Sequence, residues 1–328
     1  MATTEVPEDP FQPNNWGRWG SDDERGALNL ITPEKIKRAL AIPSQGRVLQ
    51  LGQIVVGAAQ HSLFPVPVSP IGAQPIHVVS PTGGDWAPLP AGEHHEGMGA
   101  DEVAKSFGVT ADGVGYCEDY LTIRMHANAT HVDALGHVWR DSQMYNGFRS
   151  EHVVSTGMRR LGIENLGAVV TRGILLDIAA LNGVERLAAS HTITTEELVA
   201  ACERAGVELE AGDAVVLRTG WASRYFEDKE EWLQKTPGID ARSALWLAQR
   251  DVALVGSDTH RLEVYPFAPD GPKAPAHVVL LRNHGIHIIE MLVLEELSKA
   301  GAGEFLFNLI VLPVRGGTGC PVNPLAII

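Results

Sequence analysis

Two histidines and an aspartate share a seven-residue stretch near the middle of the chain: His131, Asp133 and His137. Imidazole nitrogens and carboxylate oxygens suit Zn²⁺ or Mn²⁺ as ligands. Because side chains alternate along an extended strand, His131 and Asp133 would project to the same side and could share one ion. His137 follows Gly136 and could approach the same point from a turn. The spacing fits a metal site, and it equally fits a hydrogen-bonded His–Asp pair in a polar core.

Short apolar or alternating runs bounded by Gly, Pro or Asp predict the strands that would position these side chains. The predicted core strands cover residues 120–125, 168–178, 213–218, 252–256 and 305–314, with a further strand over 47–58. Capping residues and helix-ending glycines predict helices over residues 32–41, 194–206, 240–249 and 288–300. The alternation predicts one α/β domain over residues 31–328, preceded by an extended arm over residues 1–30.

Residues from about 65 to 100 carry many of the prolines and glycines and predict a long loop. A loop of this length is seldom an idle connector, so we expect it to face the substrate. His94 and His95 within it, and His260 later in the chain, are secondary candidates for substrate contact.

Composition narrows the class of protein. The chain has 328 residues, of which 45% are hydrophobic and 20% charged, as in globular proteins. A formal net charge of −14 disfavours nucleic acid and anionic membranes as partners. Only three scattered cysteines, no visible signal peptide and no apolar run of about 18 residues lead us to expect a cytoplasmic protein.

The segment 126–137, His-Ala-Asn-Ala-Thr-His-Val-Asp-Ala-Leu-Gly-His, resembles the signature His-x-Gly-Thr-His-x-Asp-x-x-x-His. That signature belongs to the cyclase family of metal-dependent hydrolases, which includes bacterial kynurenine formamidase and isatin hydrolase. Further blocks that resemble the family are NWGRWGSDDERGALN (15–29), RGILLD (172–177), LRTGW (217–221), GSDT (256–259), HVVLLRNHGIHIIE (277–290) and GGTGCPVNP (316–324).

The resemblance implies a swivelling β/β/α fold with a mixed β-sheet core flanked by helices, and a homodimer or homotetramer. It also implies a metal centre in which His131, Asp133, His277 and Glu290 are ligands, since His277 and Glu290 match a later pair of the family. Independently of the family, Glu290 ends an apolar run, where an ionised carboxylate is costly unless it is paired or metal-bound.

One position departs from the family signature. Ala127 stands where the family has its first ligand, and His126 precedes it by one residue. On a regular strand His126 would point away from the face that His131 and Asp133 share, although a bulge could turn it back. His126 is therefore the fifth candidate ligand, and occupancy by Zn or Mn depends on whether it reaches the site.

These residues predict a divalent-metal-dependent hydrolase of an amide or ester bond, possibly cyclic, in a small molecule. Metal-bound water would be the nucleophile, and His137 the general base, because imidazole titrates near working pH. Two alternatives stay open at this point: a metal-poor cyclase or dehydratase of secondary metabolism, and a non-catalytic small-molecule binder.

Overall fold

A computed structural model describes residues 6–61, 63, 65–67, 74–80, 117–126 and 128–328. The chain divides into two units. The larger one comprises residues 1–54, 67–71 and 125–328, and the smaller one residues 55–66 and 72–124.

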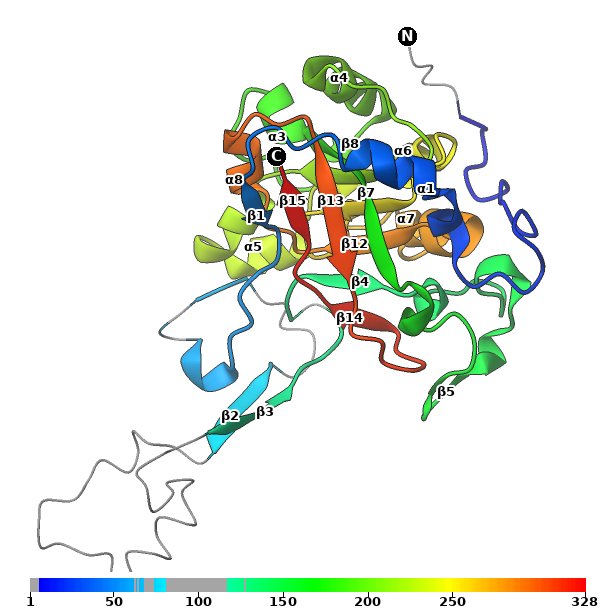
Figure 1. The fold of residues 1–328 in the computed structure, drawn as a ribbon, viewed down its shortest axis with the longest axis horizontal. Helices are drawn as coiled ribbons and strands as arrows, with labels where there is room; N and C mark the ends of the chain where they lie inside the picture. Colours follow the sequence, from blue (N-terminus) through cyan, green and yellow to red (C-terminus); the bar gives the residue numbers. More distant parts are fainter. Residues whose placement is uncertain (1–5, 62, 64, 68–73, 81–116, 127) are drawn as a thin grey trace, which may run out of the picture. The chain divides into compact units, whose positions relative to one another are not determined.

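The larger unit is built on a mixed nine-stranded sheet with the order β1-β15-β13-β7-β9-β11-β12-β4-β14 (Figure 1). Its strands are β1 (Val48–Gln50), β4 (His131–Asp133), β7 (Ala168–Asp177), β9 (Ala214–Arg218), β11 (Leu254–Ser257), β12 (His287–Glu290), β13 (Glu304–Ile310), β14 (Gly319–Pro321) and β15 (Leu325–Ile327). Strands β7, β9, β11 and β12 run parallel, and the strands on either side of them pair antiparallel.

The helices of this unit are α1 (Pro33–Ala39), α3 (Ile178–Leu181), α4 (Thr195–Ala205), α5 (Lys229–Gln234), α6 (Ala241–Ala248), α7 (Pro275–His277) and α8 (Glu295–Lys299). Helix α7 continues into a π-helical segment, η8 (Val278–Asn283). Short 3-10 turns are η1 (Gly26–Leu30), η3 (Leu135–His137), η4 (Tyr145–Gly147), η5 (Ser150–His152), η6 (Ile163–Asn165) and η7 (Trp221–Phe226). Two small ladders pair β5 (Val153–Val154) with β6 (Gly157–Met158) and β8 (Thr192–Ile193) with β10 (Gly238–Ile239).

Two hydrophobic clusters form the core, and the alternation of β7 shows that they lie on opposite faces of the sheet. Ile174 and Leu176 belong to the cluster that includes residues of α4 and α6, whereas Leu175 belongs to the cluster that includes Phe305 and Phe307 of β13. This arrangement confirms the predicted α/β class with a mixed sheet between helices.

The predicted helix starts are confirmed by their caps. The Thr32 hydroxyl accepts from the backbone N–H of Lys35, Thr194 and Glu197 form a capping box, and Asp240 accepts from the N–H of Ser243. Each side chain satisfies an amide that the first helical turn leaves free.

Three predicted elements are wrong. Residues 288–300 are not one helix: β12 occupies the apolar start and α8 begins only at Glu295. A buried parallel strand and a buried helix both appear as continuous apolar runs, so the sequence pattern does not separate them. The strand expected over 47–58 is confined to β1, because the N–H groups of Gly52 and Gln53 donate to the side chains of Asn323 and Thr130 instead of continuing the backbone ladder.

The third correction concerns residues 120–125, which are not a core strand. In the smaller unit β3 (Glu118–Thr122) pairs with β2 (Ile76–Ser80), and all five residues of β3 are exposed. A 3-10 turn, η2 (Ala58–Gln60), precedes this pair of strands. Strand β2 lies inside the loop predicted at about 65–100, and the rest of that loop, with His94 and His95, falls mostly outside the described residues.

The described part of the N-terminal segment packs against its own unit. Asn15 Nδ2 donates to the carbonyl of His284 and Trp16 Nε1 donates to that of Arg282. The division of the chain at residue 30 stays a prediction. Among the described residues, none of the helices has the length and apolarity that a membrane span requires.

Candidate metal centre

Three elements bring the predicted ligands together. His131 and Asp133 are the two ends of β4, and their alternation places both side chains on one face of the strand. Strand β12 pairs with β4 in a register that sets Glu290 opposite His131. His277 comes from the last residue of α7.

The four side chains form a closed ring in which nitrogen and oxygen donors alternate. His131 Nε2 lies 3.7 Å from Asp133 Oδ1 and 3.4 Å from Glu290 Oε2. His277 Nε2 lies 3.5 Å from Asp133 Oδ2 and 3.3 Å from Glu290 Oε1. All four residues are buried. We call this arrangement the donor ring.

Three residues of the donor ring, Asp133, His277 and Glu290, bring one donor atom each within 4.8 Å of one another, as a divalent ion requires, and His131 lies against both carboxylates. Ligands about 2.1 Å from a tetrahedral zinc ion are roughly 3.4 Å from one another, and the four edges of the ring run from 3.3 to 3.7 Å. One oxygen of each carboxylate, Asp133 Oδ2 and Glu290 Oε1, is buried without a hydrogen-bond donor in ideal geometry. Both oxygens face His277 Nε2, at 3.5 and 3.3 Å, so a cation that took the place of its proton would meet both carboxylates.

His126 and His137 lie beside the ring. His126 Nδ1 is 2.8 Å from Asp133 Oδ1, and its Nε2 is 2.9 Å from the hydroxyl of Thr318. The ring of His137, placed by the turn η3, stacks on that of His126 with centroids 4.0 Å apart. Donor atoms of His126, Asp133 and His137 fall within 4.8 Å of one another. The structure thus gathers all six predicted site residues.

The expectation that His126 points away from the other ligands rested on a regular strand, and the local structure is not one. Strand β4 begins only at His131, and the described residues from Ile123 to Thr130 are outside any strand. His126 therefore comes close to Asp133 without the parity rule being broken. Ala127 itself lies outside the described residues.

The electrostatics of the ring are those of buried, mutually stabilised charges. Burial alone would raise the pKa of Glu290, but His131 and His277 lower it to about 2. Burial likewise opposes ionisation of Asp133, yet His137, His126 and His277 hold its pKa well below the ordinary value. Both carboxylates are thus ionised at neutral pH, which is the form that binds metal.

The histidines divide into two groups. Burial would lower the pKa of His131 and His277, but the carboxylates around them outweigh it and raise both values. His137 behaves oppositely, because its burial among protein groups lowers the pKa to about 4 despite the nearby Asp133. His137 is consequently neutral at pH 7 and able to accept a proton.

Two residues at the site were not predicted from the sequence: Glu263, whose Oε1 lies 2.8 Å from His277 Nδ1, and Thr318, which contacts His126. Thr318 lies in a family-like block, which was a usable signal, but nothing in the sequence near Glu263 indicates its position. His260 is buried and its ring lies 4.3 Å from that of Trp232, so it is part of the packed wall near this end of β11.

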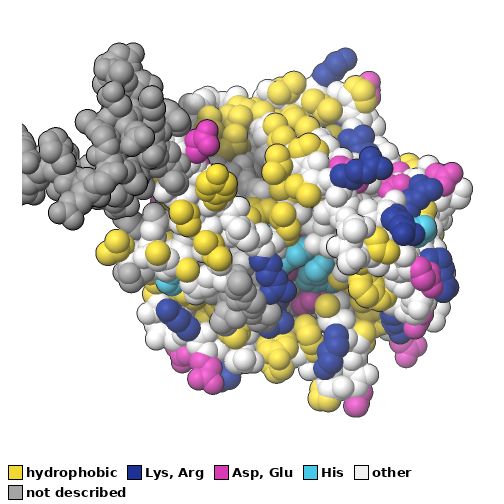
Figure 2. Space-filling model, turned by 90° about the horizontal axis from the view of Figure 1, so that it is seen from below, with side chains coloured by type: hydrophobic (Ala, Val, Ile, Leu, Met, Phe, Trp, Pro, Cys, Tyr) yellow, Lys and Arg dark blue, Asp and Glu magenta, His cyan; other side chains and the backbone are white. Residues whose placement is uncertain are grey.

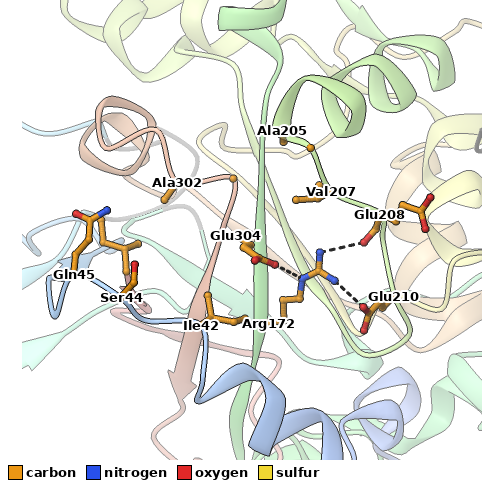
Figure 3. Close-up of a pocket in the computed structure, with 13 residues that line it drawn as sticks. Ile42, Ser44, Gln45, Arg172, Ala205, Val207, Glu208, Glu210, Ala302 and Glu304 are labelled. Carbon is orange, nitrogen blue, oxygen red and sulfur yellow. Dashed lines mark hydrogen bonds and ion pairs between the residues drawn. The ribbon is translucent and has the colours of Figure 1, made fainter.

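Access to the site runs past His126, whose side chain is 18% exposed, and past the partly exposed His137. Figure 2 shows histidine side chains in a hollow on one face, with acidic and basic side chains beside them and hydrophobic ones around. A separate pocket of about 420 Å³ is lined by Arg172, whose guanidinium is already paired with Glu210 and Glu304 (Figure 3). None of the six predicted site residues lines that pocket.

Comparison with known proteins gives a consistent picture. A family model described as "Putative cyclase" matches residues 58–264. Isatin hydrolase of Roseibium aggregatum is 24% identical over 232 residues, which are 69% of this chain and 81% of that protein. Cyclase-like protein 3 of Oryza sativa subsp. japonica is 27% identical over 200 residues, 60% of this chain and 61% of that protein.

Solved structures agree with the fold. The crystal structure of a novel cyclase matches with a TM-score of 0.82 at 31% identity, covering 97% of this chain and all (100%) of the other. An isatin hydrolase bound to the product analogue thioisatinate matches with a TM-score of 0.56 at 16% identity, covering 86% of this chain and 92% of the other. The second likeness concerns the fold alone.

Proposed function

We propose that this chain, which belongs to the cyclase family, is a divalent-metal-dependent hydrolase of an amide or ester bond in a small molecule. The resemblance noted for the segment 126–137 is confirmed by the family match, and the chain is an enzyme of the hydrolase or cyclase type. The reaction and the roles of individual residues are our proposal.

The donor ring carries the proposal. Two buried carboxylates face His131 and His277, and a divalent cation that displaced the protons of these histidines would neutralise both negative charges. His131, Asp133, His277 and Glu290 would hold the ion, with zinc or manganese suited to this mixture of imidazole and carboxylate. When bound, such an ion polarises a carbonyl group and lowers the pKa of a water molecule.

The residues of the chain supply the proton chemistry. His137 is neutral at pH 7 and lies beside Asp133, so a ring nitrogen is available to take the proton that water loses when it attacks the carbonyl. The same nitrogen then returns the proton to the departing amine or alcohol. His126, held between Asp133 and Thr318, fixes the orientation of the Asp133 carboxylate and supports the ring of His137.

The names of the relatives support a substrate class. One relative is called isatin hydrolase, and isatin is a cyclic amide. We therefore place cyclic amides and cyclic esters first among the candidate substrates.

The proposal is tested by comparing metal-free, zinc-loaded and manganese-loaded protein on a panel of cyclic and linear amides and esters. Hydrolysis of at least one class should depend on added metal and should be lost in Glu290→Gln, which removes one charge from the donor ring. Turnover that is unaffected by complete metal removal would contradict the proposal and favour the metal-poor cyclase or dehydratase.

A further inference from the structure

We infer that Glu263 is a positioning residue: its carboxylate fixes His277 in the one tautomer that presents Nε2 to the metal. The inference rests on the proposed function, since it takes the donor ring as a metal site. Glu263 is buried, with 1% of its surface exposed, in the segment that comes after β11.

Three contacts hold the Glu263 carboxylate in place. Its Oε2 accepts from the backbone N–H groups of Ala276 at 2.7 Å and His277 at 3.3 Å. Its Oε1 lies 2.8 Å from His277 Nδ1. Glu263 therefore hydrogen-bonds the main chain of His277 and makes a close ion-pair contact with its ring, although His277 Nδ1 and Oε1 are not aligned for an ideal hydrogen bond.

The chemistry of the pair fixes the proton. An ionised carboxylate only accepts hydrogen bonds, so the ring nitrogen that faces it must carry the proton. With the proton on Nδ1, a neutral His277 has its lone pair on Nε2, which is the nitrogen that faces Asp133 and Glu290. A carboxylate partner also makes the imidazole a stronger donor to a metal.

His131, the other histidine of the donor ring, has a different partner at Nδ1. His131 Nδ1 lies 2.9 Å from the backbone carbonyl of Ala129, a neutral acceptor that no side-chain substitution removes. The two imidazoles of the donor ring thus have different partners at Nδ1. Only the partner of His277 is a side chain, so only that partner can be removed by a substitution.

The change Glu263→Gln tests this directly. The Gln oxygen should stay with the two backbone N–H groups, because turning it away would leave both without an acceptor. The amide NH₂ then faces His277 Nδ1, and the ring is driven to the tautomer with the proton on Nε2. We expect zinc affinity, measured by competition with a chelator, to fall about 10- to 100-fold, as for other losses of an outer-shell partner.

Asp258→Asn is the matched control. Asp258 is also buried beyond β11 and accepts from backbone N–H groups, here those of Thr219 and Gly220, and it contacts none of the ring residues in the described structure. Its loss should lower stability while leaving zinc affinity unchanged. A general effect of destabilisation would lower zinc affinity in both variants.

Nitrogen-15 NMR of the histidine rings in zinc-loaded protein gives a readout that a merely structural role would not move. The wild type should show His277 with Nδ1 protonated, assigned by comparison with His277→Gln. An unprotonated Nδ1 in the wild type, or equal zinc affinity in the wild type and Glu263→Gln, would overturn this inference alone. Failure of the wild type to bind zinc or manganese would overturn the proposed function and this inference with it.

Discussion

Asp133 is the side chain that three histidines of the site contact in common. One oxygen contacts His126 and His131, and the other faces His277. Its position is dictated locally, since β4 is three residues long and puts His131 and Asp133 on the same face. The spacing of His131 and Asp133 in the sequence is therefore enough to predict that their side chains lie together.

We predict that His137→Ala retains zinc and the fold but lowers turnover by about 10² to 10⁴, the range for loss of a general acid or base. The reason is that His137 is neutral and lies beside the donor ring rather than in it. Steady-state kinetics and metal analysis on the same preparation check both halves. Loss of zinc together with activity would make His137 a ligand instead of a base.

The sequence predicted the residues of the segment 126–137 better than those that come later in the chain. His131 and Asp133 are expected from strand parity, and His137 from a turn after Gly136. His277 and Glu290 are far away in the chain, so their approach was implied only by the family resemblance. Glu263 had no signal at all, because its role depends on the path of the chain between β11 and α7.

At the scale of elements, one side chain outside the donor ring joins the ends of the parallel strands β9 and β11. Asp258 comes directly after β11 and reaches the turn after β9, where its carboxylate accepts from the N–H and hydroxyl of Thr219 and from the N–H of Gly220. Gly220 has a φ of +73°, and a Cβ there would lie 2.2 Å from the carbonyl oxygen of Glu185. The turn is therefore tightly determined, and Asp258 joins the ends of two neighbouring strands.

We predict that Asp258→Asn lowers the free energy of unfolding by about 2 to 4 kcal/mol, because an amide NH₂ would face donors that now meet a carboxylate oxygen. Burial raises the pKa of Asp258 to about 7, so urea unfolding should be measured at pH 8, where the carboxylate is charged.

Asp240→Asn is the comparison for that measurement. Asp240 caps α6 through a single backbone N–H, that of Ser243, and asparagine serves as well as aspartate at such a position. Its cost should stay below about 0.5 kcal/mol. Equal losses in the two variants would mean that Asp258 acts only as an ordinary cap.

Helices that begin at a capping residue could be predicted from the sequence. Strands that form only because they pair with distant strands could not. Thr32, Thr194 and Asp240 mark their helices correctly because capping is a local interaction. The run that became β12 carries no such signal at its start. Its conformation is decided by the strands β11 and β4 on either side, which sequence patterns do not show.

At the scale of the whole molecule, buried neutral histidines make stability depend on pH. Burial, followed by the charge of Arg261, lowers the pKa of His260 to about 3. Below the ordinary value of 6.5 the unfolded chain binds a proton there that the folded chain does not bind. The free energy of unfolding that His260 contributes is therefore lost as the pH falls from 6.5 toward 3.

We predict that the wild type loses about 1 kcal/mol more than His260→Gln when the pH is lowered from 6.5 to 5.5. Urea unfolding of metal-free protein at both pH values measures the difference, and contributions of the other groups cancel. The partly exposed His152 provides a control in His152→Gln. Parallel stability curves for the wild type and His260→Gln would contradict the assignment.

The prediction of a homodimer or homotetramer stays open at this scale, as does the expectation of a cytoplasmic protein. The net charge led to the expectation that nucleic acid is not a partner, whereas the expectation of a small-molecule substrate came from the candidate metal site and the family resemblance. The family match and the fold agree with the enzyme class. The identity of the substrate depends on the walls of the hollow, which the sequence patterns do not describe.

The most direct test of the central claim is an anomalous difference map at the zinc absorption edge, from crystals of the protein grown with zinc. We predict a peak inside the donor ring, about 2.0 to 2.2 Å from donor atoms of His131, Asp133, His277 and Glu290. A map with no peak there, while those four side chains still contact one another as a closed ionic cluster, would contradict the account.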